Sequence, residues 1–208
     1  MFDSALRRRF DTPLTVMAES LDRPWISPDR LTVFGLGLGI ASAVCAGFQL
    51  WLIAAVLWLL SRLLDGLDGS LARVRRTPGR RLESSAGGFL DITSDFVVYG
   101  AAVFGVGIGA SVEFGSPWWP FVAVLLTYYV NGGAFLAFSS LAEKAGRTID
   151  DGRSLSFFGR IAEATETIVI HTVWLLVPSA AWIIAIGWAV FVGASATQRI
   201  VAGYRALV

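Results

Sequence analysis

Two stretches of the chain, DGLDGSLAR at residues 65–73 and GGFLDITSD at residues 87–95, carry four aspartates at the ends of otherwise apolar segments. Asp65 and Asp68 are three residues apart, and Asp91 and Asp95 are four apart. On helices, residues at these spacings share one face. Two such helices side by side would aim four carboxylates at one point, where they would repel one another without a cation among them. All-oxygen ligation suits Mg²⁺ or Mn²⁺, so the sequence predicts a divalent-metal site.

The composition indicates a membrane protein. Of the 208 residues, 55% are hydrophobic and 16% are charged, whereas ordinary soluble domains carry about 25% charged residues. The mean hydropathy is +0.64. The net charge of +1 gives no electrostatic reason to expect a nucleic-acid partner. Cys45 is the only cysteine, which excludes a disulfide framework and a cysteine-based metal site. The N-terminus does not have the pattern of a cleaved signal peptide.

The apolar segments predict an all-α integral membrane protein with six transmembrane helices, because a spanning helix needs about 20 mostly apolar residues. Ser27 and Pro28 suit the N-cap and first position of the first helix. Gly35, Gly37 and Gly39 suit close helix packing better than a nucleotide-binding loop. The predicted helices cover residues 28–48, 50–75, 87–110, 118–141, 161–178 and 181–205, with a short turn at 113–117.

The first part of the chain predicts a different kind of element. Residues 1–26 mix arginines and acids with apolar residues, as in an N-terminal amphipathic helix that lies on the membrane surface. Residues 27–205 would then form the six-helix bundle. We therefore expect residues 1–208 to be a single membrane-embedded domain with no soluble module.

The basic residues predict the orientation. The 17 Lys and Arg gather at one set of helix ends: in the segment up to Arg30, at the motif end of the second predicted helix, in the loops after the second and fourth, and near the C-terminus. Glu113 is the only charged residue in the opposite turns. By the positive-inside rule, both termini are cytoplasmic. Both aspartate pairs are then expected at the cytoplasmic face of the membrane.

The aspartate spacing resembles the signature of the CDP-alcohol phosphotransferase (CDP-alcohol phosphatidyltransferase) family, which is Asp-x2-Asp-Gly-x2-Ala-Arg followed by Gly-x3-Asp-x3-Asp. Every fixed position has a match here: Asp65, Asp68, Gly69, Ala72, Arg73, Gly87, Asp91 and Asp95. One departure is the spacer of 13 residues between Arg73 and Gly87, which is longer than in the family pattern. The additional residues are polar and basic, as in a lengthened loop.

The resemblance implies transfer of a substituted phosphate from a CDP-alcohol to an acceptor hydroxyl, with release of CMP. It implies that Asp65, Asp68 and Asp91 are the core metal ligands, and that Asp95 is the general base and a further metal ligand. Small residues would leave room for the cytidine, and an arginine would pair with the diphosphate. The implied CDP-binding residues are Thr32, Gly66, Gly69, Ala72, Arg73 and Gly87.

With the predicted orientation, the expected donor is CDP-diacylglycerol among the membrane lipids, and the acceptor is small and cytosolic. Arg153 and Arg160 precede the fifth predicted helix and suit a phosphate on the acceptor; they would equally suit membrane anchoring or pairing with Glu163 and Glu166. We expect a phosphorylated polyol, such as glycerol 3-phosphate or inositol phosphate. The implied setting is phospholipid biosynthesis by a homodimer in the bacterial inner membrane.

Three alternatives stay open. The first is a phosphotransferase that uses CDP-choline or CDP-ethanolamine with a lipid acceptor. The second is an intramembrane prenyltransferase, which would not need Gly-x2-Ala-Arg after the second aspartate. The third is an ion-coupled transporter, whose acids would lie nearer the bilayer midplane and often at broken helices. Of the other polar residues within spans, Asn131 suits the site or an interhelical hydrogen bond, and His171 suits packing better than metal ligation.

Overall fold

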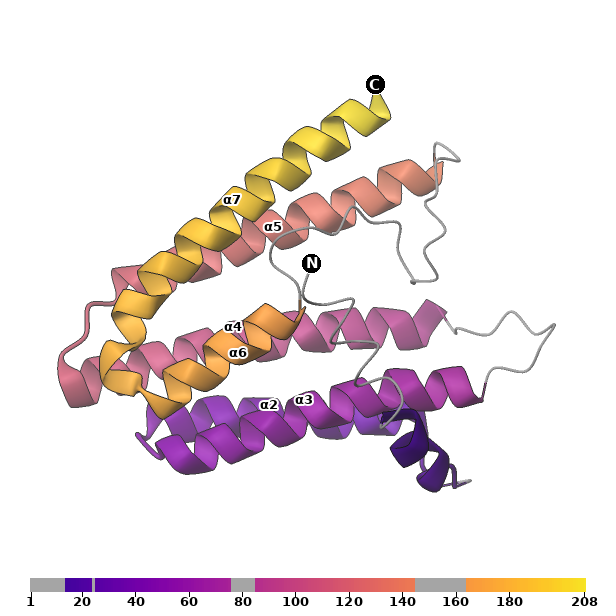
Figure 1. Ribbon diagram of the computed structural model, residues 1–208, viewed down its shortest axis with the longest axis horizontal. Coiled ribbons are helices and arrows are strands. Elements are labelled where there is room, and N and C mark those ends of the chain that lie inside the picture. The colour runs from indigo at the N-terminus through magenta and orange to yellow at the C-terminus, as the bar shows by residue number, and fades with distance from the viewer. Residues whose placement is uncertain (1–13, 24, 76–84, 145–163) are drawn as a thin grey trace.

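The computed structural model describes residues 14–23, 25–75, 85–144 and 164–208 (Figure 1). These residues are helical almost throughout and contain no strand, which confirms the predicted all-α class. The principal elements are α2 (Pro28–Gly47), α3 (Trp51–Val74), α4 (Ser85–Phe114), α5 (Trp119–Lys144), α6 (Ala164–Leu176), the 3-10 turn η1 (Pro178–Ala180) and α7 (Ala181–Leu207).

Four stretches of the described chain are long and apolar enough to cross a membrane: Pro28–Gly47, Ala86–Phe114, Trp119–Lys144 and Pro178–Leu207. Helix α3 has 24 residues, or about 36 Å, but the charged residues of the motif interrupt its second half. Helix α6 has 13 residues in the described range. Four of the six predicted spans are therefore confirmed as helices that could cross a membrane. For α3 and α6, membrane spanning stays a prediction.

One predicted boundary is wrong. The turn was expected to begin at Glu113, but α4 continues to Phe114. The additional turn carries a contact across the bundle: Trp51 Nε1 donates a hydrogen bond to the Glu113 carboxylate at 2.5 Å. This bond ties the last turn of α4 to the first turn of α3.

The helices run back and forth between two ends of the molecule (Figure 1). Helix α2 packs against both α3 and α4, α5 packs against α7, and α6 packs on α3. The end of α3, the start of α4 and the ends of α5 and α7 lie toward one side in Figure 1, and the short connections lie toward the other. This alternation brings both aspartate pairs to the same end of the bundle.

Glycines allow α2, α3 and α4 to approach closely. A Cβ at Gly105 or Gly109 of α4 would lie 2.1 Å from a carbonyl oxygen of α2, and one at Gly39 would lie 2.6 Å from a side chain of α4. At Gly35 the same atom would be in ordinary contact with α3, at 3.4 Å. Nothing lies within 4 Å of that position at Gly37. The predicted packing role is therefore confirmed at Gly35 and Gly39 and is wrong at Gly37.

A buried polar and aromatic network joins the two groups of helices. Trp188 Nε1 of α7 donates to the Tyr128 hydroxyl of α5 at 2.7 Å, and that hydroxyl is 2.9 Å from His171 Nε2 of α6. The His171 ring stacks on Trp58 of α3, with ring centroids 4.8 Å apart. His171 is thus a packing residue, as expected, and its ring packs against Trp58, which precedes Asp65 and Asp68 on α3.

Only part of the predicted N-terminal helix falls within the described residues. Residues 14–20 form a short helix, whereas residues 1–13 and 24 lie outside the description. The segment is attached to the motif end of α3, because Arg75 forms an ion pair with Asp22 at 2.6 Å and donates to the Arg23 carbonyl at 2.9 Å. Its placement on a membrane surface stays a prediction.

Candidate active site

The carboxylates of Asp65, Asp68 and Asp91 converge where α3 ends and α4 begins. Each offers one oxygen, and the three oxygens lie within 4.8 Å of one another. Asp65 and Asp68 come together because they are separated by one helical turn, and Asp91 is supplied by the neighbouring antiparallel helix. Three hard oxygen donors in one cluster fit Mg²⁺ or Mn²⁺, as predicted, better than a softer ion that prefers nitrogen or sulfur.

Helix α2 orients one of these ligands. Asp68 is 5% exposed, and its Oδ2 accepts a hydrogen bond from the Thr32 hydroxyl. The start of α2 is fixed as predicted, since the Ser27 side chain caps it by accepting from the Arg30 backbone N–H at 3.2 Å. A partner that holds the other oxygen of a metal ligand fixes the ligand's orientation. Thr32 therefore supports the cluster from a third helix.

Asp95 lies outside the group of three and has a partner of its own. Nη1 of Arg62 is 2.7 Å from Asp95 Oδ1 and 3.7 Å from Asp65 Oδ1. In the sequence, Arg62 is one of the basic residues at the motif end of the second predicted helix, and this contact was not predicted. The available signal was an arginine alone in an apolar segment, one turn before Asp65, where a buried charge requires a partner.

The predicted CDP-binding residues of α3 lie beside the cluster. Arg73 is exposed, donates from Nη2 to Ser70 Oγ at 3.0 Å, and lies 3.5 Å from where a Cβ of Gly69 would be. Gly66 faces the Leu14 side chain, 3.5 Å from the corresponding position. Ala72 is exposed on α3, and Gly87 is half-buried in the first turns of α4. The predicted acceptor residues Arg153 and Arg160 lie outside the described residues.

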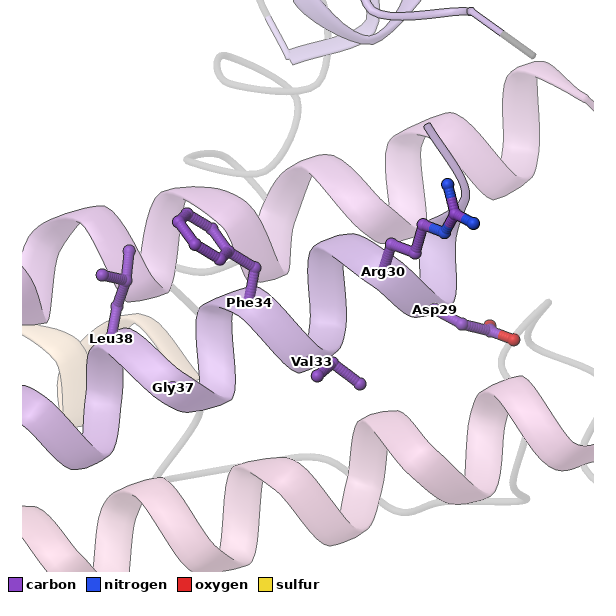
Figure 2. Close-up of a pocket in the computed structure, with 6 residues that line it drawn as sticks. All are labelled: Asp29, Arg30, Val33, Phe34, Gly37 and Leu38. Atoms are coloured by element: carbon purple, nitrogen blue, oxygen red, sulfur yellow. The ribbon is translucent and has the colours of Figure 1, made fainter. Parts of the chain in front are cut away.

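A hollow of about 450 Å³ follows the outer face of α2, away from Thr32 and Gly35, which face α3. Figure 2 shows the residues that line it arranged along this one helix. It is charged at one end and apolar along the rest, with lining residues Asp29, Arg30, Val33, Phe34, Gly37 and Leu38. The hollow includes none of the carboxylates of the cluster. The hollow also explains why the predicted packing role is wrong at Gly37: this glycine lines the hollow and does not contact a neighbouring helix.

The fold and the site together define a class: an α-helical membrane protein with a divalent-metal site of aspartates at one end of the bundle. Residues 25–193 match the family model described as CDP-alcohol phosphatidyltransferase. The chain belongs to this family of enzymes, which confirms the resemblance read from the aspartate spacing.

Two curated relatives cover most of the chain. The inner membrane protein YnjF of Escherichia coli K12 is 36% identical over 185 residues, which are 86% of this chain and 84% of that protein. The archaetidylinositol phosphate synthase of Pyrococcus horikoshii is 27% identical over 151 residues, 70% of this chain and 78% of that protein. The sequence relatives therefore agree with the family assignment, and one of them is itself an inner membrane protein.

Solved structures share the fold. The phosphatidylinositol phosphate synthase of Mycobacterium tuberculosis with CDP-DAG bound superposes with a TM-score of 0.71 at 23% identity, covering 92% of this chain and 93% of that one. The same enzyme in complex with manganese and citrate gives a TM-score of 0.70, covering 92% and 88%. The chain therefore has the same helical fold as the Mycobacterium tuberculosis synthase.

Proposed function

We propose that the protein is a divalent-metal-dependent phosphatidyltransferase that transfers a phosphatidyl group from CDP-diacylglycerol to the hydroxyl of a small polar acceptor and releases CMP. The observation that carries the proposal is the convergence of Asp65, Asp68 and Asp91 in a chain of this family. Further support comes from the structurally similar Mycobacterium tuberculosis enzyme, which was solved with CDP-DAG and, separately, with manganese.

The chain's own residues have distinct tasks in this reaction. Asp65, Asp68 and Asp91 hold the divalent ion, which when bound neutralises the charge of the diphosphate. Arg73, at the exposed end of α3, pairs with the diphosphate. Asp95 takes the proton from the acceptor hydroxyl while the acceptor oxygen bonds to phosphorus and the bond from phosphorus to CMP breaks. Thr32 keeps Asp68 in its orientation.

The small residues beside these groups serve the nucleotide. Gly69 and Ala72 of α3 and Gly87 of α4 would leave the backbone open to a flat cytidine. Thr32 of α2, which is buried and bonded to Asp68, and Gly66, which faces the Leu14 side chain, would line the nucleotide site beside them. The acyl chains of the donor would remain in the bilayer beside the apolar helices. The inner-membrane relative from Escherichia coli supports the bacterial inner membrane as the location.

The acceptor we propose is a phosphorylated polyol. Relatives in sequence and in fold are named as synthases of inositol phosphate lipids, which favours inositol phosphate over glycerol 3-phosphate. Arg153 and Arg160 would bind the acceptor's phosphate by bidentate contacts. Arg153→Ala and Arg160→Ala should then raise the KM for the acceptor much more than the KM for the donor.

The experiment that tests the function is CMP release by the purified protein in detergent, with CDP-diacylglycerol and Mg²⁺ or Mn²⁺. The acceptor panel is glycerol 3-phosphate, inositol phosphate, inositol, serine and choline, with Asp91→Asn as the matched inactive control. We expect release with a phosphorylated acceptor only. Preference for CDP-choline with diacylglycerol, or no CMP from any combination, would contradict the proposal.

A further inference from the structure

Residues 14–23 lie beside the motif end of α3 and contact it at two points (Figure 1). At the first point, Leu14 Cδ1 lies 3.5 Å from where a Cβ of Gly66 would be. At the second, the Arg75 side chain, just after the last turn of α3, binds the other end of the segment. Nine residues separate Gly66 from Arg75, which is about 13.5 Å along a helix. The segment is therefore attached at both ends of the last turns of α3.

The segment has one apolar side that faces the protein. Leu14, Ala18 and Leu21 are spaced by four and three residues, so they share one side of the short helix and of the turn that ends it. Ala18 is fully buried, and Leu14 and Leu21 are half-buried. Val16 and Met17, between them, are 60% and 42% exposed. The segment thus packs on the bundle in one defined orientation.

The Arg75 guanidinium makes three contacts with the end of the segment. Its Nε donates to Asp22 Oδ1 at 2.7 Å, and its Nη2 lies 2.6 Å from the same oxygen and donates to the Arg23 carbonyl at 2.9 Å. The planar guanidinium allows this forked contact, which an ammonium group cannot reproduce. The two side chains are 31% and 44% exposed. A single ion pair at such exposure contributes little, but this one completes a contact that the buried Ala18 begins.

The part of α3 that the segment holds carries three of the predicted CDP-binding residues, Gly69, Ala72 and Arg73. Arg75 itself belongs to the spacer of 13 residues between Arg73 and Gly87, which is longer than in the family pattern. A longer loop constrains the ends that it joins less, and the last turn of a helix opens readily because its carbonyl groups have no intrahelical partner. A contact at Arg75 supplies the constraint that the lengthened loop does not.

We propose that Arg75 is a positioning residue for the CDP-alcohol donor. By binding Asp22 and the Arg23 carbonyl, it holds the last turns of α3 against the N-terminal segment, so that Arg73 and the small residues before it keep the arrangement that the CDP group requires. The inference rests on the proposed function, because it concerns how the donor of that reaction is bound. It gives residues 14–23 a task in the donor site in addition to their predicted contact with the membrane surface.

Hydrogen–deuterium exchange of the full chain in detergent, without any substrate, tests the contact itself. Asp22→Ala and Arg75→Ala should each raise the exchange rate of the amides of residues 69–75 by about fivefold, the upper range for a partly exposed ion pair. Glu19→Ala is the matched control, since it removes one acid from an exposed position of the same segment; it should exchange like the wild type. Unchanged exchange in both Asp22→Ala and Arg75→Ala would refute the proposal without reference to any reaction.

Binding of CDP-diacylglycerol, measured without an acceptor, tests the consequence. Asp22→Ala should raise the Kd by about fivefold, although removal of a negative charge would by itself favour an anionic donor. The double variant Asp22→Ala, Arg75→Ala should raise the Kd no further than either single change, because both act through one contact. Arg75→Lys keeps the charge but not the fork, so it should bind as weakly as Arg75→Ala.

The contrary results are equally definite. Tighter binding in Asp22→Ala, or wild-type binding in Arg75→Lys, would show that Arg75 acts only as a surface charge and would overturn the proposal. The two proposals can also fail separately, because neither measurement needs turnover. A wild-type protein that does not bind CDP-diacylglycerol would contradict the proposed function. Equal binding of this lipid by the wild type and by Asp22→Ala would contradict the role of Arg75 alone.

Discussion

At the scale of single residues, four aspartates with similar spacing have different surroundings. Asp68 is buried and held by Thr32, whereas Asp95 is paired with Arg62. Asp65 faces both the cluster and the arginine. The motif therefore identifies the group of acids, and the neighbours of each acid determine what it can do.

The first prediction separates the base from the ligands. Asp95→Asn should lower kcat by about 10²–10⁴-fold, the usual contribution of a general base, and leave the KM for CDP-diacylglycerol nearly unchanged, because a base acts on the acceptor. Steady-state CMP release measures both quantities. Asp68→Asn is the comparison, since it should raise the Mn²⁺ concentration needed for half-maximal activity. Near-normal turnover in Asp95→Asn would show that another group takes the proton.

The second prediction concerns Thr32, whose hydroxyl donates to Asp68. Thr32→Val keeps the side-chain shape but removes the donor, so the Mn²⁺ requirement should rise by about 10-fold, as for other residues that orient metal ligands. Thr32→Ser retains the hydroxyl and should behave like the wild type. Activity as a function of Mn²⁺ at saturating substrates measures the effect. If only the donor's KM changes, Thr32 serves the nucleotide and not the metal ligand.

At the scale of helices, the site depends on how closely α2 and α4 approach. Helix α2 packs on both α3 and α4: its contact with α3 brings Thr32 to Asp68, and its contact with α4 holds the helix that supplies Asp91 and Asp95. Gly105 and Gly109 allow the approach, because any side chain there would collide with the α2 backbone. Small residues at such positions are the usual means by which membrane helices pack closely.

The third prediction tests this contact. Gly105→Ala would place a Cβ 2.1 Å from the Ala43 carbonyl oxygen, so the helices must separate, at a cost of about 1–3 kcal/mol or more. The midpoint of thermal unfolding in detergent should fall. Gly37→Ala is the matched control, because nothing lies within 4 Å of its Cβ position and alanine is the better helix former. Equal stability of both variants would mean that the contact between α2 and α4 is looser than described.

At the scale of the whole molecule, the alternating helices place both aspartate pairs at the end where α3, α5 and α7 finish (Figure 1), and the last turns of these helices carry Arg73, Lys144 and Arg205. That end is predicted to be cytoplasmic. The expectation of one domain over residues 1–208 and of a homodimer also belongs to this scale. Light scattering of the purified protein, corrected for detergent, would measure the oligomeric state.

The fourth prediction concerns orientation. Single cysteines in place of Arg76 and Gly115, in a Cys45→Ala background, should react with a membrane-impermeant thiol reagent from opposite faces, with Arg76 on the cytoplasmic side. The reason is that basic loops are retained in the cytoplasm, while the loop at Gly115 carries no basic residue. Reaction of both cysteines from one face would contradict the alternation of spans.

Much of the fold and of the metal site could be predicted from the chain itself. Helical periodicity is a local property, so the spacing of Asp65 with Asp68, and of Asp91 with Asp95, determines that each pair shares a face whatever surrounds it. Apolar length likewise determined where α2, α4, α5 and α7 lie. The capping of α2 by Ser27 could be predicted for the same reason, because the Arg30 backbone N–H that it accepts from is only three residues away.

Only the tertiary structure decided which faces meet. Arg62 and Asp95 are 33 residues apart, and no local pattern states that the guanidinium points to that carboxylate rather than to a lipid headgroup. In the same way, Gly39 packs and Gly37 does not, although both interrupt the same apolar segment. The physical reason is that burying a charge or bringing two backbones together depends on which neighbour lies within a few ångströms, and that is settled by the packing of all the helices together.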